Sequence, residues 1–130
     1  MLVVDASVLV VALADDGRDG DLARARLRGE HLAAPELVDL EVASVLRRHC
    51  AGGQLNLRRA ELALADLIDL PLQRAPHAEL LSRCWELKAN LTMYDAAYVA
   101  LAEAIDSDLL TADARLAKAP GPRCRIEVLR

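Results

Sequence analysis

Short apolar stretches recur along the chain, separated by longer segments in which apolar residues return every three or four positions. The short stretches favour buried strands and the longer segments favour amphipathic helices. The predicted strands are residues 1–5, 31–34, 70–75, 109–111 and 125–129, and the predicted helices are residues 8–14, 21–28, 35–51, 57–69, 76–89 and 92–104. Because strands alternate with helices, we predict an α/β fold with a parallel sheet covered by helices on both faces. No linker or repeat interrupts the pattern, so one domain spanning residues 1–130 is expected.

Cap and turn residues predict where several of these elements begin. Ser7 is predicted to cap the first helix, and Pro35 suits the first position of the long third helix. Asn56 is predicted to cap the fourth helix. Pro71 lacks a backbone N–H, so the third strand is expected at an edge of the sheet.

Composition narrows the class of protein. The chain is 54% hydrophobic without any Phe, and no apolar run approaches the ~20 residues that a membrane helix needs. Neither a basic leader nor a small-residue cleavage site is seen at the start. The three cysteines are odd in number and lack CxxC spacing, so neither a disulfide framework nor a zinc site is indicated. We therefore expect a cytoplasmic protein that does not associate with membranes.

The formal net charge of −4 argues against a protein that coats nucleic acid, because such proteins are usually basic. The cations are mostly Arg and occur in pairs such as Arg47–Arg48 and Arg58–Arg59. Arg suits phosphate contact, yet such pairs also occur on solvated helix faces, and the sequence leaves both interpretations open.

Two acidic residues follow predicted strands. Asp5 ends the first strand, and Asp113 comes shortly after the fourth. In open parallel sheets, ligands bind beyond the carboxyl ends of the strands, so both carboxylates are expected to overhang one crevice if these strands are neighbours. Asp106 and Asp108 precede the fourth strand and are expected at the opposite edge.

Two further acidic residues lie on predicted helices. Glu41 lies at the margin of the apolar stripe of the third helix, where a free charge is costly, although a rim ion pair with Arg48 would also explain it. Asp95 completes a Thr92-x-x-Asp95 capping box, and that role does not prevent it from facing the crevice.

Carboxylates that gather closely repel one another and favour a bound cation. An all-oxygen set selects Mg²⁺ or Mn²⁺ over Zn²⁺. Ser7 and Thr111 are expected to hold the carboxylates of Asp5 and Asp113 in place by hydrogen bonds. The three histidines show no motif spacing and are interpreted as structural or surface residues: His31, His49 and His77.

Four stretches in this order resemble a PIN-domain ribonuclease, and more closely a VapC-type toxin of a type II toxin–antitoxin pair: LVVDASVLV, PELVDLEVASVLRR, LTMYDAAYVALAE and LLTADARLAKA. The resemblance covers essentially the whole chain. It implies a three-layer α/β/α sandwich with sheet order 3-2-1-4-5, and a metal-binding and catalytic quartet of Asp5, Glu41, Asp95 and Asp113. Ser7 and Thr111 match supporting hydroxyls, and Ser44 departs from the Asn that relatives often carry.

The same resemblance implies a Mg²⁺- or Mn²⁺-dependent endoribonuclease that cleaves structured RNA, often tRNA or rRNA, and so inhibits translation. It further implies a homodimer that a small antitoxin silences, covering helices near the site, here residues 35–51 and 57–69. A PIN nuclease of RNA processing without an antitoxin, and a catalytically silent PIN binding module, remain alternatives.

Two other classes fit poorly. A phosphoaspartyl receiver needs an Asp ending the third strand, which here ends near Arg74, and a haloacid-type phosphatase needs a second Asp where Ser7 stands. The aromatic residues Trp85, Tyr94 and Tyr98 are too few for a base-stacking platform, so RNA recognition is expected to depend on phosphate contacts and shape.

Overall fold

A parallel sheet of five strands forms the centre of the computed structural model, which describes all 130 residues. The strands are β1 (Leu2–Val4), β2 (Leu32–Pro35), β3 (Leu72–Ala75), β4 (Leu109–Thr111) and β5 (Ile126–Val128). Their order in the sheet is β3-β2-β1-β4-β5, and every neighbouring pair is parallel. The expected fold class and strand order are both confirmed, and β3 lies at an edge as Pro71 indicated.

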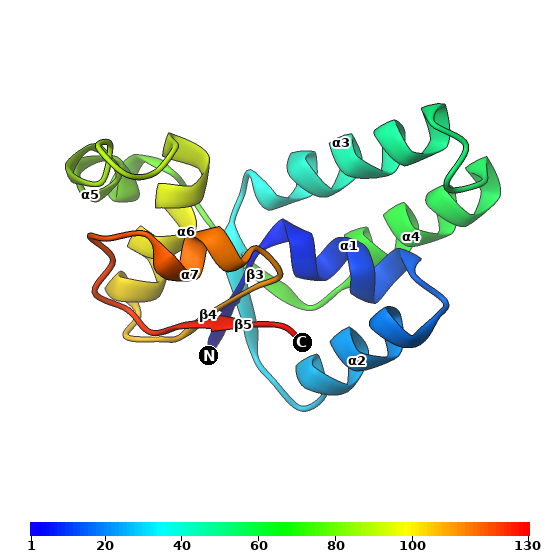
Figure 1. Ribbon diagram of the computed structural model, residues 1–130, viewed down its shortest axis with the longest axis horizontal. Helices are drawn as coiled ribbons and strands as arrows, with labels where there is room; N and C mark the ends of the chain where they lie inside the picture. Colours follow the sequence, from blue (N-terminus) through cyan, green and yellow to red (C-terminus); the bar gives the residue numbers. More distant parts are fainter.

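Helices lie on both sides of this sheet. The helices are α1 (Ala6–Ala14), α2 (Arg18–Leu27), α3 (Val38–Ala51), α4 (Leu57–Asp69), α5 (Leu81–Glu86), α6 (Met93–Ala104) and α7 (Ala114–Lys118), with a short 3-10 turn η1 (Ala78–Leu80) before α5. Figure 1 shows α1 to α4 on one side of the strands and α5 to α7 on the other. From β1 to β3 the chain adds strands toward one edge of the sheet, and from β4 to β5 toward the other edge. Because each crossover is right-handed, this reversal puts the helices of the two halves on opposite faces.

The core lies between these layers. The strands β1 and β4 are buried along their whole length, and α6 is buried continuously from Ala96 to Ala102. Thirty buried residues form one apolar cluster, in which Tyr98 is among the largest fully buried side chains. A helix that is apolar on nearly every face needs cover on several sides, and α6 obtains it from β1, β2, β4 and α5. None of the helices is long and apolar enough to cross a membrane.

Two predicted helix starts are confirmed. The Asn56 side chain accepts a hydrogen bond of 2.8 Å from the Arg59 N–H at the start of α4, and the Thr92 hydroxyl accepts one of 3.1 Å from the Asp95 N–H at the start of α6. These bonds satisfy backbone donors that have no partner within the first turn of a helix.

The predictions for Pro35 and Ser7 are wrong. Pro35 is the last residue of β2, where it pairs with Ala75 of β3, and α3 begins only at Val38. A Pro fits this strand end because the next residue, Glu36, donates the following hydrogen bond to the Ala75 carbonyl. The first helix begins at Ala6, with Asp5 at its N-cap, so Ser7 lies within the first turn.

Three helices also differ from the predictions. The helix α2 begins at Arg18 rather than at residue 21, and the helix expected over residues 76–89 is reduced to η1 and the short α5. The helix α7 was not predicted, because only Leu116 of its five residues is buried and its apolar pattern is too short to recognise.

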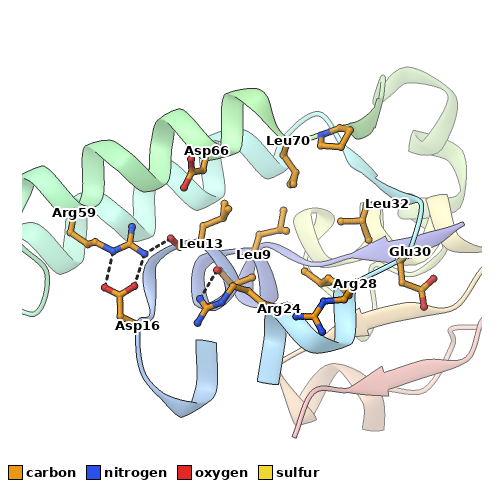
Figure 2. Close-up of a pocket in the computed structure, with 13 residues that line it drawn as sticks. Leu9, Leu13, Asp16, Arg24, Arg28, Glu30, Leu32, Arg59, Asp66 and Leu70 are labelled. Carbon is orange, nitrogen blue, oxygen red and sulfur yellow. Dashed lines mark hydrogen bonds and ion pairs between the residues drawn. The ribbon is translucent and has the colours of Figure 1, made fainter. Parts of the chain in front are cut away.

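A hollow of about 670 Å³ lies between α1, α2 and α4, away from the acidic edge of the sheet. Figure 2 shows leucine side chains between Arg59 and Asp16 at one end and Glu30 at the other. Arg59 donates to the Leu13 carbonyl, and Arg24 donates to carbonyls of Ala12 and Asp15. These arginines satisfy carbonyls that the end of α1 leaves without a partner, which gives them a structural role.

Candidate active site

Asp5 and Asp113 lie at the same edge of the sheet. Asp5 directly follows β1, and Asp113 follows β4, the strand paired with β1. The Asp5 N–H donates a hydrogen bond of 2.9 Å to the Leu110 carbonyl, which fixes the end of one strand against the other. The expectation that these strands are neighbours is therefore confirmed.

Two hydroxyl groups hold the Asp5 carboxylate. Asp5 is only 8% exposed, and its Oδ2 accepts hydrogen bonds from the Thr111 hydroxyl at 2.7 Å and the Ser7 hydroxyl at 3.0 Å. The fully buried Thr111 hydroxyl also accepts the Asp113 N–H at 3.0 Å, and the Ser7 hydroxyl accepts the Ala112 N–H at 3.0 Å. Thr111 and Ser7 thus connect the ends of β1 and β4 through their side chains.

Glu41 lies in the first turn of α3 and reaches toward α6. Its Oε1 accepts a hydrogen bond of 2.6 Å from the phenol of Tyr98, and Glu41 forms no ion pair with Arg48. Burial raises the pKa of Glu41, and the negative charges of Asp5 and Asp95 raise it further, while the Tyr98 bond opposes both. Burial and the neighbouring Glu41 carboxylate raise the pKa of Tyr98, which keeps the phenol protonated as a donor.

Asp95 combines the two roles that the sequence left open. Its N–H is capped by Thr92 at the start of α6, while its half-buried carboxylate is exposed to the negative charges of Asp5 and Asp113. Burial raises the pKa of Asp95, with further contributions from Asp5 and Asp113. An acid whose ionised form is disfavoured in this way, at the ligand-binding edge of a parallel sheet, is a candidate functional group.

Asp113 is held differently from the other three acids. It is the N-cap of α7, and its Oδ1 accepts the Arg115 N–H at 2.9 Å. The Arg115 guanidinium also lies 3.3 Å from each carboxylate oxygen. The hydrogen bond from the Arg115 side chain lowers the pKa of Asp113 below the ordinary value for Asp.

Asp106 and Asp108 lie at the opposite edge, as expected. Asp108 precedes β4 and pairs with Arg125 at 3.0 Å, and its carbonyl accepts the Val3 N–H at the start of the sheet. Ser107 donates to the Met1 carbonyl there. These residues take no part in the acidic edge.

The four acids fit a hard divalent cation in the chemistry of their donors. They are all-oxygen ligands, and the negative charges of Asp5 and Asp95 on Glu41, and of Asp5 and Asp113 on Asp95, are repulsions that a cation would relieve. No three His, Cys, Asp or Glu side chains converge closely enough to hold a metal ion as they stand. Glu41 bonds to Tyr98 and Asp113 to Arg115, so both carboxylates have other partners in this arrangement.

Sequence reasoning missed two residues that contact acids of this site. Tyr98 was considered only as an aromatic ring, although it follows Asp95 by one helical turn and therefore shares its face of α6. His77, expected to be structural or on the surface, has a structural role, since its Nε2 accepts the Leu37 N–H at 3.0 Å directly before α3. Arg115 could not be assigned because α7 was not predicted. Ser44, the departure noted above, is exposed.

The fold is that of a PIN domain, and the PIN domain family matches residues 2–122. Ribonuclease VapC1 of Mycobacterium tuberculosis is 43% identical over 129 residues, which cover 98% of this chain and 97% of that protein. The chain belongs to the PIN-domain family and, within it, to the VapC group.

Solved structures share the fold. VapBC2 from Rickettsia felis, bound to a DNA fragment from the promoter, matches with a TM-score of 0.72 and 13% identity, covering 99% of this chain and 98% of that one. A toxin–antitoxin complex from Klebsiella pneumoniae matches with a TM-score of 0.68 and 18% identity, covering 100% and 98%. At these identities the likeness supports the architecture.

Proposed function

We propose that this protein is a Mg²⁺- or Mn²⁺-dependent endoribonuclease and the toxin of a toxin–antitoxin pair. The observation that carries the proposal is the buried Asp5 carboxylate, held by Thr111 and Ser7 at the carboxyl end of β1. A buried carboxylate without a cationic partner is costly, and a bound divalent cation offsets that cost. The 43% identical relative is named a ribonuclease, and the donor set of this chain suits the same chemistry.

Each acidic side chain has a distinct part in the proposed reaction. Asp5 is the fixed ligand, because two hydroxyls define its orientation. Glu41, Asp95 and Asp113 complete the donor set, and Glu41 or Asp95, whose pKa values are raised, is suited to orient or deprotonate the attacking water. A bound Mg²⁺ or Mn²⁺ supplies polarisation of the phosphodiester and a lower pKa of bound water.

The proposed substrate is a structured RNA such as tRNA or rRNA, and its cleavage would inhibit translation. Tyr98 is fully buried, so only Trp85 and Tyr94 remain exposed for stacking on bases. Two exposed rings give little base readout, which favours recognition through phosphates and RNA shape. Because this substrate is a cellular RNA, we place its action in the cytoplasm.

The proposed protein partner is a small antitoxin that covers α3 and α4. An apolar groove of about 280 Å³ lies between these helices, lined by residues such as Leu46, Leu57 and Leu64. Leu40 and Ile68, on the same two helices, are largely exposed. We further propose a homodimer. Exposed apolar surface of this kind marks contact sites for protein partners.

The activity is tested with purified protein on total cellular RNA, with Mg²⁺, with Mn²⁺ and with EDTA. We expect cleavage only with metal, and loss of cleavage in Asp5→Asn, whose amide keeps an oxygen for the Thr111 and Ser7 hydroxyls while losing the charge. Sequencing of the cleaved RNA ends identifies the target. Asp108→Asn, at the opposite edge of the sheet, is the matched control and should cleave as the wild type does. Cleavage in EDTA, or by Asp5→Asn, contradicts the proposal.

The partner is tested by expressing the chain from its native operon and measuring the mass of the complex by light scattering. A small protein that co-purifies and inhibits cleavage supports the toxin assignment, whereas an active nuclease without such a partner favours an RNA-processing role. Leu57→Glu should weaken the complex without reducing cleavage, because Leu57 is exposed and begins α4 after the loop that follows the end of α3, whereas Glu41 lies in the first turn of α3.

A further inference from the structure

One cation sits against the acidic edge. The Arg115 guanidinium lies 3.3 Å from each oxygen of Asp113, and its positive charge partly offsets the rise in the pKa of Asp95. Both acids belong to the quartet proposed above. Arg115 thus balances part of the negative charge at this edge while it is paired with Asp113.

The Arg115 pair differs from the arginine pairs that stabilise the fold. Those pairs have N–O distances of 2.7 to 2.9 Å and arginine side chains that are 20 to 28% exposed: Arg26–Glu127, Arg59–Asp16, Arg74–Asp39 and Arg83–Glu103. Three of these arginines also donate to backbone carbonyls: Arg59, Arg74 and Arg83. Arg115 is 92% exposed, and Asp113 is its sole partner.

An exposed ion pair of this kind contributes little to folding, because water screens it and the long side chain loses conformational entropy. Its position is better explained by the site. A planar guanidinium can bind two oxygens of a phosphate as it binds those of a carboxylate. The acidic edge would otherwise repel a polyanion, and Arg115 puts a positive charge at that point.

We propose that Arg115 exchanges partners during the reaction cycle: it pairs with Asp113 when no divalent cation is bound, and contacts the RNA phosphate beside the scissile bond when Asp113 turns to the cation. This inference rests on the proposed function. It makes Arg115 a substrate-positioning residue and an internal competitor for the metal. Loss of its side chain should therefore tighten metal binding and weaken RNA binding.

Arg125 provides the matched control. It also forms an exposed ion pair with an aspartate, Asp108, with a side chain that is 73% exposed, but at the opposite edge of the sheet. Arg115→Ala and Arg125→Ala thus remove the same charge from largely exposed side chains. Arg115→Lys keeps the positive charge and removes the planar guanidinium that can bind two oxygens at once.

The first measurement is the rise in melting temperature of the full chain during a Mn²⁺ titration without RNA. We expect the apparent Kd of Arg115→Ala for Mn²⁺ to fall about two- to fivefold, which is the strength of an exposed ion pair. Arg125→Ala should match the wild type. Without metal, the melting temperatures of both variants should stay within about 2 °C of the wild type, which shows that the fold is intact.

The second measurement is RNA cleavage at saturating Mn²⁺ over a range of salt concentrations. For Arg115→Ala we expect KM to rise about tenfold with a smaller change in kcat, since a charge-assisted contact to the bound substrate is lost. The slope of log KM against log salt should become shallower by about 0.7 for one lost phosphate contact. Arg115→Lys should recover the salt slope and only part of KM.

The results separate two failures. A wild type that neither binds Mn²⁺ nor cleaves RNA overturns both the proposed function and this inference. A wild type that does both, with Arg115→Ala indistinguishable from Arg125→Ala in KM and in Mn²⁺ affinity, overturns the role of Arg115 alone. Weaker Mn²⁺ binding by Arg115→Ala also contradicts it, because a competitor has then not been removed.

Discussion

The phenol of Tyr98 donates a 2.6 Å hydrogen bond to Glu41, and this bond joins α6 on one side of the sheet to α3 on the other. The ring of Tyr98 is fully buried and held by its packing, whereas Glu41 has a long side chain with several rotamers. The bond therefore fixes one acid of the site relative to Asp95, which lies on the same helix as Tyr98.

Removing this hydroxyl tests its role in positioning. Tyr98→Phe keeps the buried ring, so we expect the fold to persist with a loss of about 1 kcal/mol in the free energy of unfolding. RNA cleavage should fall about 10- to 100-fold if Glu41 is the metal ligand proposed above, because Tyr98 then orients it. Tyr94→Phe changes an exposed phenol on the same helix and should leave both quantities near the wild type. Wild-type cleavage by Tyr98→Phe would show that Glu41 does not need this bond.

Losing the hydroxyl of Thr111 should reduce stability and cleavage more than losing its methyl group. Thr111→Val leaves the Asp113 N–H without its acceptor and removes one of two donors to Asp5, at a cost of about 1 to 3 kcal/mol in a buried setting. Thr111→Ser keeps both bonds and loses one methyl group, at about 1 kcal/mol. Urea denaturation and cleavage rates compare the two variants. Equal rates in Val and Ser would exclude a role for the hydroxyl.

The metal-free site should be more stable when Glu41 carries no charge. The folded-state pKa of Glu41 is raised above 4.5 by burial and by Asp5 and Asp95, so its protonated form favours the folded state below that pH. This contribution is lost as the pH rises through the folded-state pKa. In EDTA at pH 7, the free energy of unfolding of Glu41→Gln should therefore exceed that of the wild type. The gain should be no more than about 1 kcal/mol, because solvent partly screens a half-exposed group.

The same comparison at lower pH provides its own control. Below about pH 4.5 the wild-type Glu41 is protonated, and the difference from Glu41→Gln should close. Mn²⁺ at pH 7 should stabilise the wild type more than the variant. A variant that is less stable than the wild type at pH 7 in EDTA would contradict the repulsion inferred from the raised pKa.

His77 should affect the start of α3. Its Nε2 accepts the Leu37 N–H, which requires the neutral ring with its proton on Nδ1. His77→Phe leaves this N–H without its partner, and we expect faster amide exchange at Leu37 and slower RNA cleavage, because Glu41 lies one turn further along α3. His77→Gln supplies an oxygen near the same position and should restore both. Identical exchange in the two variants would exclude the proposed cap.

The sequence was sufficient for features that depend on local pattern. Strands such as β1 and β4 are short apolar runs, and the acids that follow them must lie at one edge of a parallel sheet. The caps of α4 and α6 depend on residues three positions apart, which a sequence displays directly. The family motifs supplied the strand order.

Features that depend on distant contacts were not predicted. Tyr98 and Glu41 are 57 residues apart, and His77 and Leu37 are 40 apart, so no local spacing relates them. Pro35 has the same φ restriction in a strand end as in a first helical turn, and only its pairing with Ala75 decides between them. The rotation of Asp113 toward Arg115 is a choice between side-chain conformers, which residue type does not determine.

The hydrogen bond between Thr111 and Asp5 spans 106 residues, and it can form only after β4 has paired with β1. During translation, Asp5 emerges early but has no hydroxyl from Thr111 to hold it until the chain has been made past β4. A nascent chain that ends before β4 therefore carries Asp5, Glu41 and Asp95 without the Thr111 bond that holds the Asp5 carboxylate. A truncated chain that stops before β4 is expected to leave this carboxylate without a fixed orientation.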